Sequence, residues 1–120
     1  MNTLRLAFAA PLILLANLLP GAAQSHTHLL KSEPAQRSEL TVAPKQALLA
    51  FAAPVRLTAV NLQSEADKKS QPLKPLPATS VTEAKLDLPA LTPGHYTINW
   101  RAAGEDGHVM SGTIFFTLKK

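Results

Sequence analysis

The chain has 120 residues, with 12 Lys and Arg against 8 Asp and Glu, a formal net charge of +4 and no cysteine. The lack of cysteine excludes disulfides and thiolate metal sites, and with them zinc-finger, iron–sulfur and copper(I)-thiolate centres. The positive charges are scattered and form no basic stripe with interleaved aromatic residues, so the sequence argues against nucleic-acid binding.

The first 25 residues have the pattern of a cleavable signal peptide. Arg5 makes the start positive, and the apolar stretch Leu6–Leu19 is shorter than the roughly 20 residues that a membrane-spanning helix needs. Small residues at the first and third positions before the cut predict cleavage before His26. Cleavage before Gln24 is the alternative, because small residues precede it in the same pattern.

The predicted signal peptide over residues 1–25 leaves a domain over residues 26–120, exported across the inner membrane to the periplasm. Those 95 residues are enough for one small domain, which we expect to be a monomer. Arg5 is the only charged residue removed, so the mature chain keeps a net charge of +3.

Short apolar runs separated by prolines predict an all-β fold for the mature chain. No apolar stripe of helical period runs for more than two turns, and turn signals at such intervals are typical of a β-sandwich or barrel. A polar, proline-rich stretch over residues 63–77 predicts a long exposed loop. The expected strands are Leu40–Val42, Ala47–Phe51, Val55–Leu62, Ala84–Leu88, His95–Ala102 and Gly112–Lys119.

The last two strands have the clearest alternation of apolar and polar residues. This period of two is typical of strands with one buried face. We expect the inward-facing side chains to be Tyr96, Ile98, Trp100, Ala102, Ile114, Phe116 and Leu118. Phe115 and His95 should then lie on the outer face.

Asp106-Gly107-His108, between these two strands, is the first candidate for chemistry. In an extended segment, residues two apart point to the same side, so a carboxylate and an imidazole would face one metal ion together. Asp-Gly is also a common turn dipeptide, and the alternative is a plain turn with an exposed histidine.

His26-Thr27-His28 supplies the second candidate. Cleavage before His26 would give it a free α-amine beside its ring, and copper(II) favours amine, imidazole and carboxylate donors in tetragonal geometry. His26, Asp106 and His108 would then form a four-donor copper(II) site. His28, as third residue, could instead wrap copper(II) with the amine and two deprotonated amides, and would compete with that site.

The mature chain resembles the CopC family of periplasmic copper-resistance proteins, including the YobA-type members. The resemblance rests on the motifs His-x-His-Leu, Ser-Glu-Pro-Ala at 32–35, Leu-x-Phe-x-x-Pro-Val at 49–55, residues 91–101, Asp-Gly-His at 106–108 and residues 111–119. It implies a small Greek-key β-barrel or sandwich of the cupredoxin or immunoglobulin-like kind.

The same resemblance implies one Cu(II) per chain, with His26 (through its amine and ring), Asp106 and His108 as ligands. His28 matches a second histidine of some members. It also implies a CopD-like inner-membrane protein as a partner. Some relatives hold Cu(I) in a methionine-rich loop, but Met110 is the one methionine after residue 25, so no such Cu(I) methionine site is expected.

These observations predict a non-enzymatic periplasmic protein that buffers or delivers copper(II) in copper homeostasis or resistance. One alternative is a copper-dependent oxidase with a histidine-brace-like site, although a carboxylate ligand would stabilise Cu(II) against the reduction such chemistry needs. The other is a metal-free immunoglobulin-like adaptor, for which the identity of the N-terminal residue would not matter.

Overall fold

The computed structural model describes residues 28–120, which form seven β-strands and no helix. No helix in this part of the chain is therefore long and apolar enough to cross a membrane. The strands are β1 (Leu29–Glu33), β2 (Ser38–Leu40), β3 (Gln46–Ser64), β4 (Ser70–Pro72), β5 (Val81–Asp87), β6 (Gly94–Gly104) and β7 (Val109–Leu118). This confirms the predicted all-β class. The predicted signal peptide and His26 lie outside the described residues.

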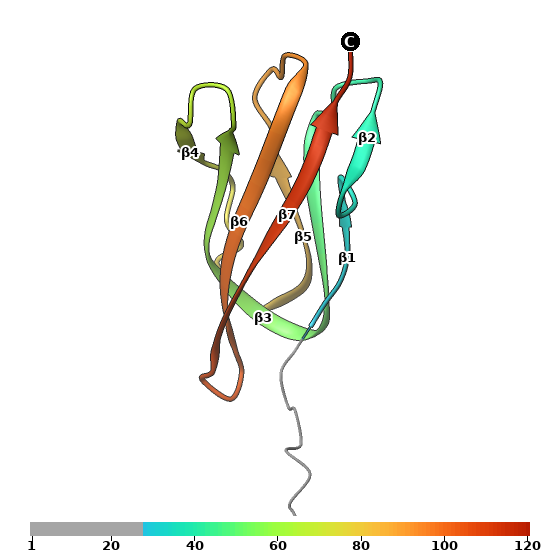
Figure 1. The fold of residues 1–120 in the computed structure, drawn as a ribbon. Coiled ribbons are helices and arrows are strands. Elements are labelled where there is room, and N and C mark those ends of the chain that lie inside the picture. The colour runs from blue at the N-terminus through green and yellow to red at the C-terminus, as the bar shows by residue number, and fades with distance from the viewer. Residues whose placement is uncertain (1–27) are drawn as a thin grey trace, which may run out of the picture.

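Strand β3 organises the fold because it pairs with four other strands. Its first part pairs with β1 on one side and β5 on the other, and its second part pairs with β6 and β4. The sheet continues from β6 to β7 by antiparallel pairing and from β7 to β2 by parallel pairing. In Figure 1, β3 runs down one side of the molecule, crosses the lower end and rises along the other. It thereby closes the sheet around one core.

The bend of β3 corrects the prediction of two separate strands, Ala47–Phe51 and Val55–Leu62. The strand continues through Pro54, between the two predicted segments, with shifts of register around the bend. Proline has no N–H to donate to a ladder, so a bulge of this kind is where a strand tolerates it.

Three other predictions of local structure were wrong. β1 was missed. The strand predicted at Leu40–Val42 is Ser38–Leu40 instead, and it leaves Val42 exposed. The segment 63–77, predicted to be an exposed loop, contains β4, which pairs with residues 61–63 of β3. It also contains Leu73, whose side chain is 2% exposed and whose N–H donates to the carbonyl of Val60.

The core confirms the alternation predicted for the last two strands. All seven predicted inward-facing residues of β6 and β7 are buried, and Phe115 is exposed. The Trp100 ring packs edge-on to Phe51, and Tyr96 stacks on Phe116. These contacts pack β6 and β7 into the core, and the turn that joins them lies at one end of this hairpin.

Candidate metal centre

Asp106 and His108 lie in the turn of the β6–β7 hairpin, at the lower end of the molecule in Figure 1. The ladder ends at the pair Ala103–Val109. Beyond it the Gly104 N–H donates to the His108 carbonyl at 2.9 Å, and the Gly107 N–H donates to the Gly104 carbonyl at 3.0 Å. The segment is a tight turn, so the prediction of an extended segment was wrong.

The turn nevertheless brings the two predicted side chains together. Asp106 Oδ1 accepts a hydrogen bond from the backbone N–H of His108 at 3.0 Å, and Asp106 Oδ2 lies 2.7 Å from His108 Nδ1. Gly107 between them has a φ of 85°, a backbone conformation that favours glycine. The bend at Gly107 folds the carboxylate back onto the imidazole.

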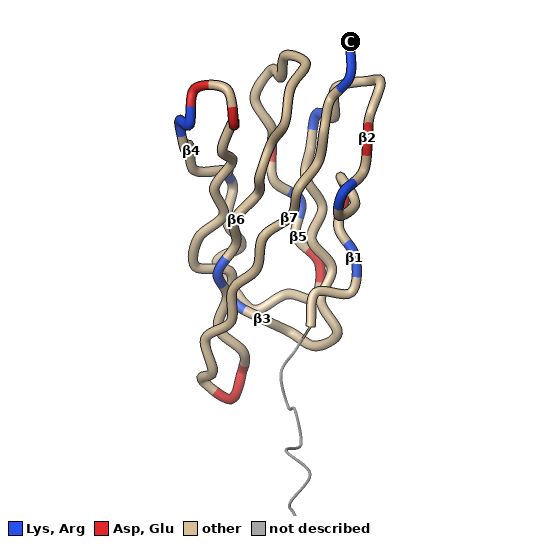
Figure 2. Tube along the Cα trace, viewed as in Figure 1, with Lys and Arg blue, Asp and Glu red and all other residues tan. Residues whose placement is uncertain are grey.

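The pair is accessible to a ligand and the carboxylate is held ionised. The side chains of His108 and Asp106 are 63% and 42% exposed. Hydrogen bonding from the His108 side chain, and then from its backbone N–H, lowers the pKa of the Asp106 carboxyl below its ordinary value. The turn therefore presents an anionic oxygen and an imidazole side by side, and Figure 2 shows this acidic tip in red.

A missing side chain makes room for this arrangement. A Cβ added to Gly104 would lie 2.9 Å from Asp106 Oδ1 and 3.5 Å from the Met110 methyl carbon. Sequence reasoning missed that Gly104 and Met110 lie close to this pair. Their proximity to Asp106 depends on the register of the hairpin, and the residue types alone carry no signal of it.

His28 is exposed and begins the described chain at the same end of the molecule (Figure 1). Its carbonyl accepts a hydrogen bond from Ala52 N–H at 3.0 Å, and three residues later Val55 pairs with Gly104. The bend of β3 thus connects the start of the domain to the β6–β7 turn. No three His, Asp or Glu side chains within residues 28–120 converge on one point that could hold a metal ion. Within this range the centre is the Asp106–His108 pair, while His26 lies outside it.

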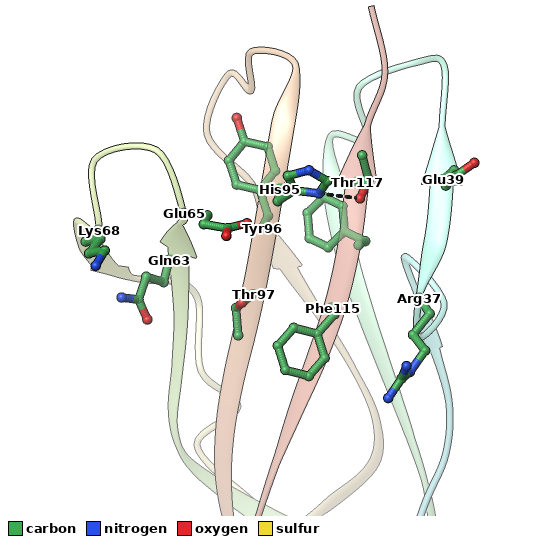
Figure 3. Close-up of a pocket in the computed structure, with 11 residues that line it drawn as sticks. Arg37, Glu39, Gln63, Glu65, Lys68, His95, Tyr96, Thr97, Phe115 and Thr117 are labelled. Carbon is green, nitrogen blue, oxygen red and sulfur yellow. Dashed lines mark hydrogen bonds between the residues drawn. The ribbon is translucent and has the colours of Figure 1, made fainter.

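A separate groove lies on another part of the described domain. A groove of about 730 Å³ crosses the outer face of β6 and β7 near their other ends, with Phe115 in it and Arg37 and Lys68 at its margins (Figure 3). It contains His95, whose Nδ1 lies 2.8 Å from Thr117 Oγ1. This agrees with the prediction that His95 lies outside the core face, and it places His95 at the end of β6 opposite to Asp106.

Comparisons with known proteins agree with the fold and with the family resemblance. Residues 29–119 match the family model of the CopC domain. The chain is 30% identical over 118 residues to the copper transport protein CutJ of Bacillus subtilis, covering 91% of this chain and 21% of that protein. It therefore spans about a fifth of the length of this curated relative.

Solved structures resemble the described domain over nearly their whole length. CopC from Methylosinus trichosporium OB3b superposes with a TM-score of 0.66 at 24% identity, covering 78% of this chain and 94% of that chain. Selenomethionine PcoC, a copper resistance protein from Escherichia coli, gives 0.62 at 25% identity, covering 77% and 99%. These likenesses confirm the predicted small Greek-key β-barrel or sandwich.

Proposed function

The chain belongs to the CopC family, and on that premise we propose that it is a periplasmic copper(II)-binding protein that buffers copper or delivers it to a partner. The observation that carries the proposal is the exposed carboxylate–imidazole pair at the β6–β7 turn, with Asp106 Oδ2 2.7 Å from His108 Nδ1. The relatives support the copper-handling part, since one is a copper transport protein and another a copper resistance protein.

The Asp106–His108 pair fits a metal ion by both its chemistry and its spacing. Carboxylate and imidazole are donors that copper(II) accepts in tetragonal geometry. Two donors that each lie about 2.0 Å from one metal ion, at a right angle, are about 2.8 Å apart. The 2.7 Å between Asp106 Oδ2 and His108 Nδ1 is close to that separation, so both atoms could reach one copper ion once the two side chains turn from each other toward it.

His26 completes the proposed ligand set after signal cleavage. Its α-amine and ring would add two nitrogen donors to Asp106 and His108, which gives one Cu(II) per chain. His28 supports this assignment by its place, because it starts the domain beside the β3 bend that also pairs with Gly104. His28 itself is a candidate ligand for the competing site formed with the amine and the first two amides.

The donor set favours binding over catalysis. A carboxylate ligand would stabilise the dipositive ion, so we expect the centre to bind Cu(II) rather than to act as an oxidase. Imidazole and amine must be deprotonated to bind copper, so the copper affinity should fall as the pH drops. Hydrogen bonding to His108 lowers the pKa of the Asp106 carboxyl, which favours the ionised carboxylate that binds a metal ion.

Native mass spectrometry of the secreted protein tests this proposal. We expect a mature chain that begins at His26 and gains one copper ion with one equivalent of Cu(II). His26→Ala and His108→Ala should each lose that uptake, while His28→Ala decides whether the competing site contributes. Uptake of no copper by the wild-type protein would overturn the proposal.

The wider assignment concerns location and partner. The signal-like first 25 residues support export to the periplasm, and the CopC family suggests a CopD-like inner-membrane protein as the recipient of copper. Co-purification of such a protein with the copper-loaded domain, but not with His108→Ala, is the expected result.

A further inference from the structure

Met110 lies on the core side of the proposed copper centre. It is the second residue of β7 and pairs with Ala102 of β6, whose side chain is buried. The Met110 side chain is partly buried and packs against the core. Its position in the alternation of β7 matches that of the buried Ile114, so it points inward at the end of the hairpin that carries Asp106 and His108.

Met110 and Asp106 both lie close to Gly104. The position that a Cβ would occupy on Gly104 is 3.5 Å from the Met110 methyl carbon and 2.9 Å from Asp106 Oδ1. The Met110 methyl carbon and the Asp106 carboxylate oxygen are therefore both close to the same point beside Gly104. No side chain of Gly104 separates them, and His108 lies against the other carboxylate oxygen.

The chemistry of the thioether complements that of the carboxylate. Carboxylate oxygen is a hard donor that suits Cu(II), whereas thioether sulfur is a soft donor that selects Cu(I). A methionine side chain has three rotatable bonds and a polarizable sulfur, so it can change rotamer while its neighbours stay in place. A single sulfur beside imidazole nitrogens is a different kind of Cu(I) site from a cluster of methionines. The small number of methionines in the sequence argues against the cluster only.

We propose that Met110 is a sulfur ligand to Cu(I) in the same centre, where it takes the place of the Asp106 carboxylate beside His108. This rests on the proposed function, because it uses the same centre. The centre then holds copper in both oxidation states, with oxygen donation to Cu(II) and sulfur donation to Cu(I). A protein that delivers copper can in this way accept or release either ion at one position.

X-ray absorption spectroscopy of the secreted protein, loaded with Cu(I) without oxygen, tests the proposal sharply. The chain has no cysteine and two methionines, of which Met1 lies in the predicted signal peptide. Copper–sulfur scattering in the mature protein can then come from Met110 alone. We expect that scattering in the Cu(I) form and its absence in Met110→Leu, a substitution that nearly conserves volume.

In competition titrations, the same variant should affect the Cu(I) affinity and the Cu(II) affinity differently. We expect Met110→Leu to lower Cu(I) affinity by roughly tenfold or more and to leave Cu(II) affinity within about twofold of wild type. An unchanged unfolding midpoint would show that the hairpin is intact. Wild-type protein with Cu(I) bound and no sulfur scattering, or a variant that keeps the scattering, would overturn the role of Met110. A different result, wild-type protein that takes up no Cu(II), would contradict the proposed function itself.

Discussion

Gly104→Ala should weaken copper(II) binding and leave the fold intact. The added methyl would lie 2.9 Å from Asp106 Oδ1, whereas unstrained contacts between carbon atoms are about 3.5–4.0 Å. The atom it meets is the end of an exposed side chain, so the carboxylate can move away by a few tenths of an ångström. Gly104 has no left-handed φ, and alanine can adopt its backbone conformation.

The magnitude of this effect follows from what the displaced carboxylate contacts. Asp106 Oδ2 lies 2.7 Å from His108 Nδ1, so moving the carboxylate disturbs both proposed ligands in the turn. Disturbing the groups that position metal ligands typically costs 10–100-fold in affinity, so we expect a loss of at least about tenfold, or about 1.4 kcal/mol. Gly104 is half-buried and lies outside the buried core, so the free energy of unfolding should stay within about 0.5 kcal/mol of wild type.

Competition of each variant with a chromogenic Cu(II) chelator measures the affinity, and urea unfolding followed by Trp100 fluorescence measures the stability. Ser111→Ala is the matched control, because Ser111 is exposed on the same hairpin, and the three atoms nearest to a Gly104 Cβ belong to Asp106 and Met110. Equal Cu(II) affinity in Gly104→Ala and wild type would refute the role of Gly104 in placing the carboxylate.

Two further predictions concern the core and the turn. Gly112→Ala should lower the free energy of unfolding by about 1–3 kcal/mol, because its Cβ would lie 2.6 Å from atoms of the Trp100 ring. That ring is buried and cannot move aside as a surface carboxylate can. An unchanged urea midpoint would contradict this prediction. In the metal-free protein, NMR titration should give Asp106 a carboxyl pKa below its ordinary value, and His108→Ala should raise it, because His108 donates to the carboxylate. Because the Asp106 pKa is lowered in the folded protein, its contribution to stability is fully present above the ordinary carboxyl pKa and is lost as pH falls through the lowered one. A pKa of Asp106 that does not change in His108→Ala would refute the contact.

The strands that could be predicted are those whose own side chains alternate. β6 and β7 each bury one face, so apolar residues recur with a period of two and mark the strand. β1 and β4 are short and mostly polar, and they form because β3 offers them a partner. β3 itself continues through Pro54, where a local rule predicts a break, because pairing with β5 and β6 on either side of the bend holds it in place.

The site could be predicted as a pair of residues but not as a geometry. Asp106 and His108 were identified from their types and spacing, yet a turn rather than an extended segment brings them together. The structural reason is Gly107, whose φ of 85° reverses the chain. The contributions of Gly104 and Met110 depend on which residues the hairpin register places opposite each other, and this information is absent from any local pattern.

The most direct test of the copper(II) centre compares two exposed histidines at opposite ends of the same hairpin. His108 lies in the β6–β7 turn, and His95 lies at the opposite end of β6 against Thr117. In a competition titration of the secreted protein, His108→Ala should lose Cu(II) affinity by at least about a hundredfold, while His95→Ala should stay within about twofold of wild type. Equal affinity of His108→Ala and wild type would contradict the account.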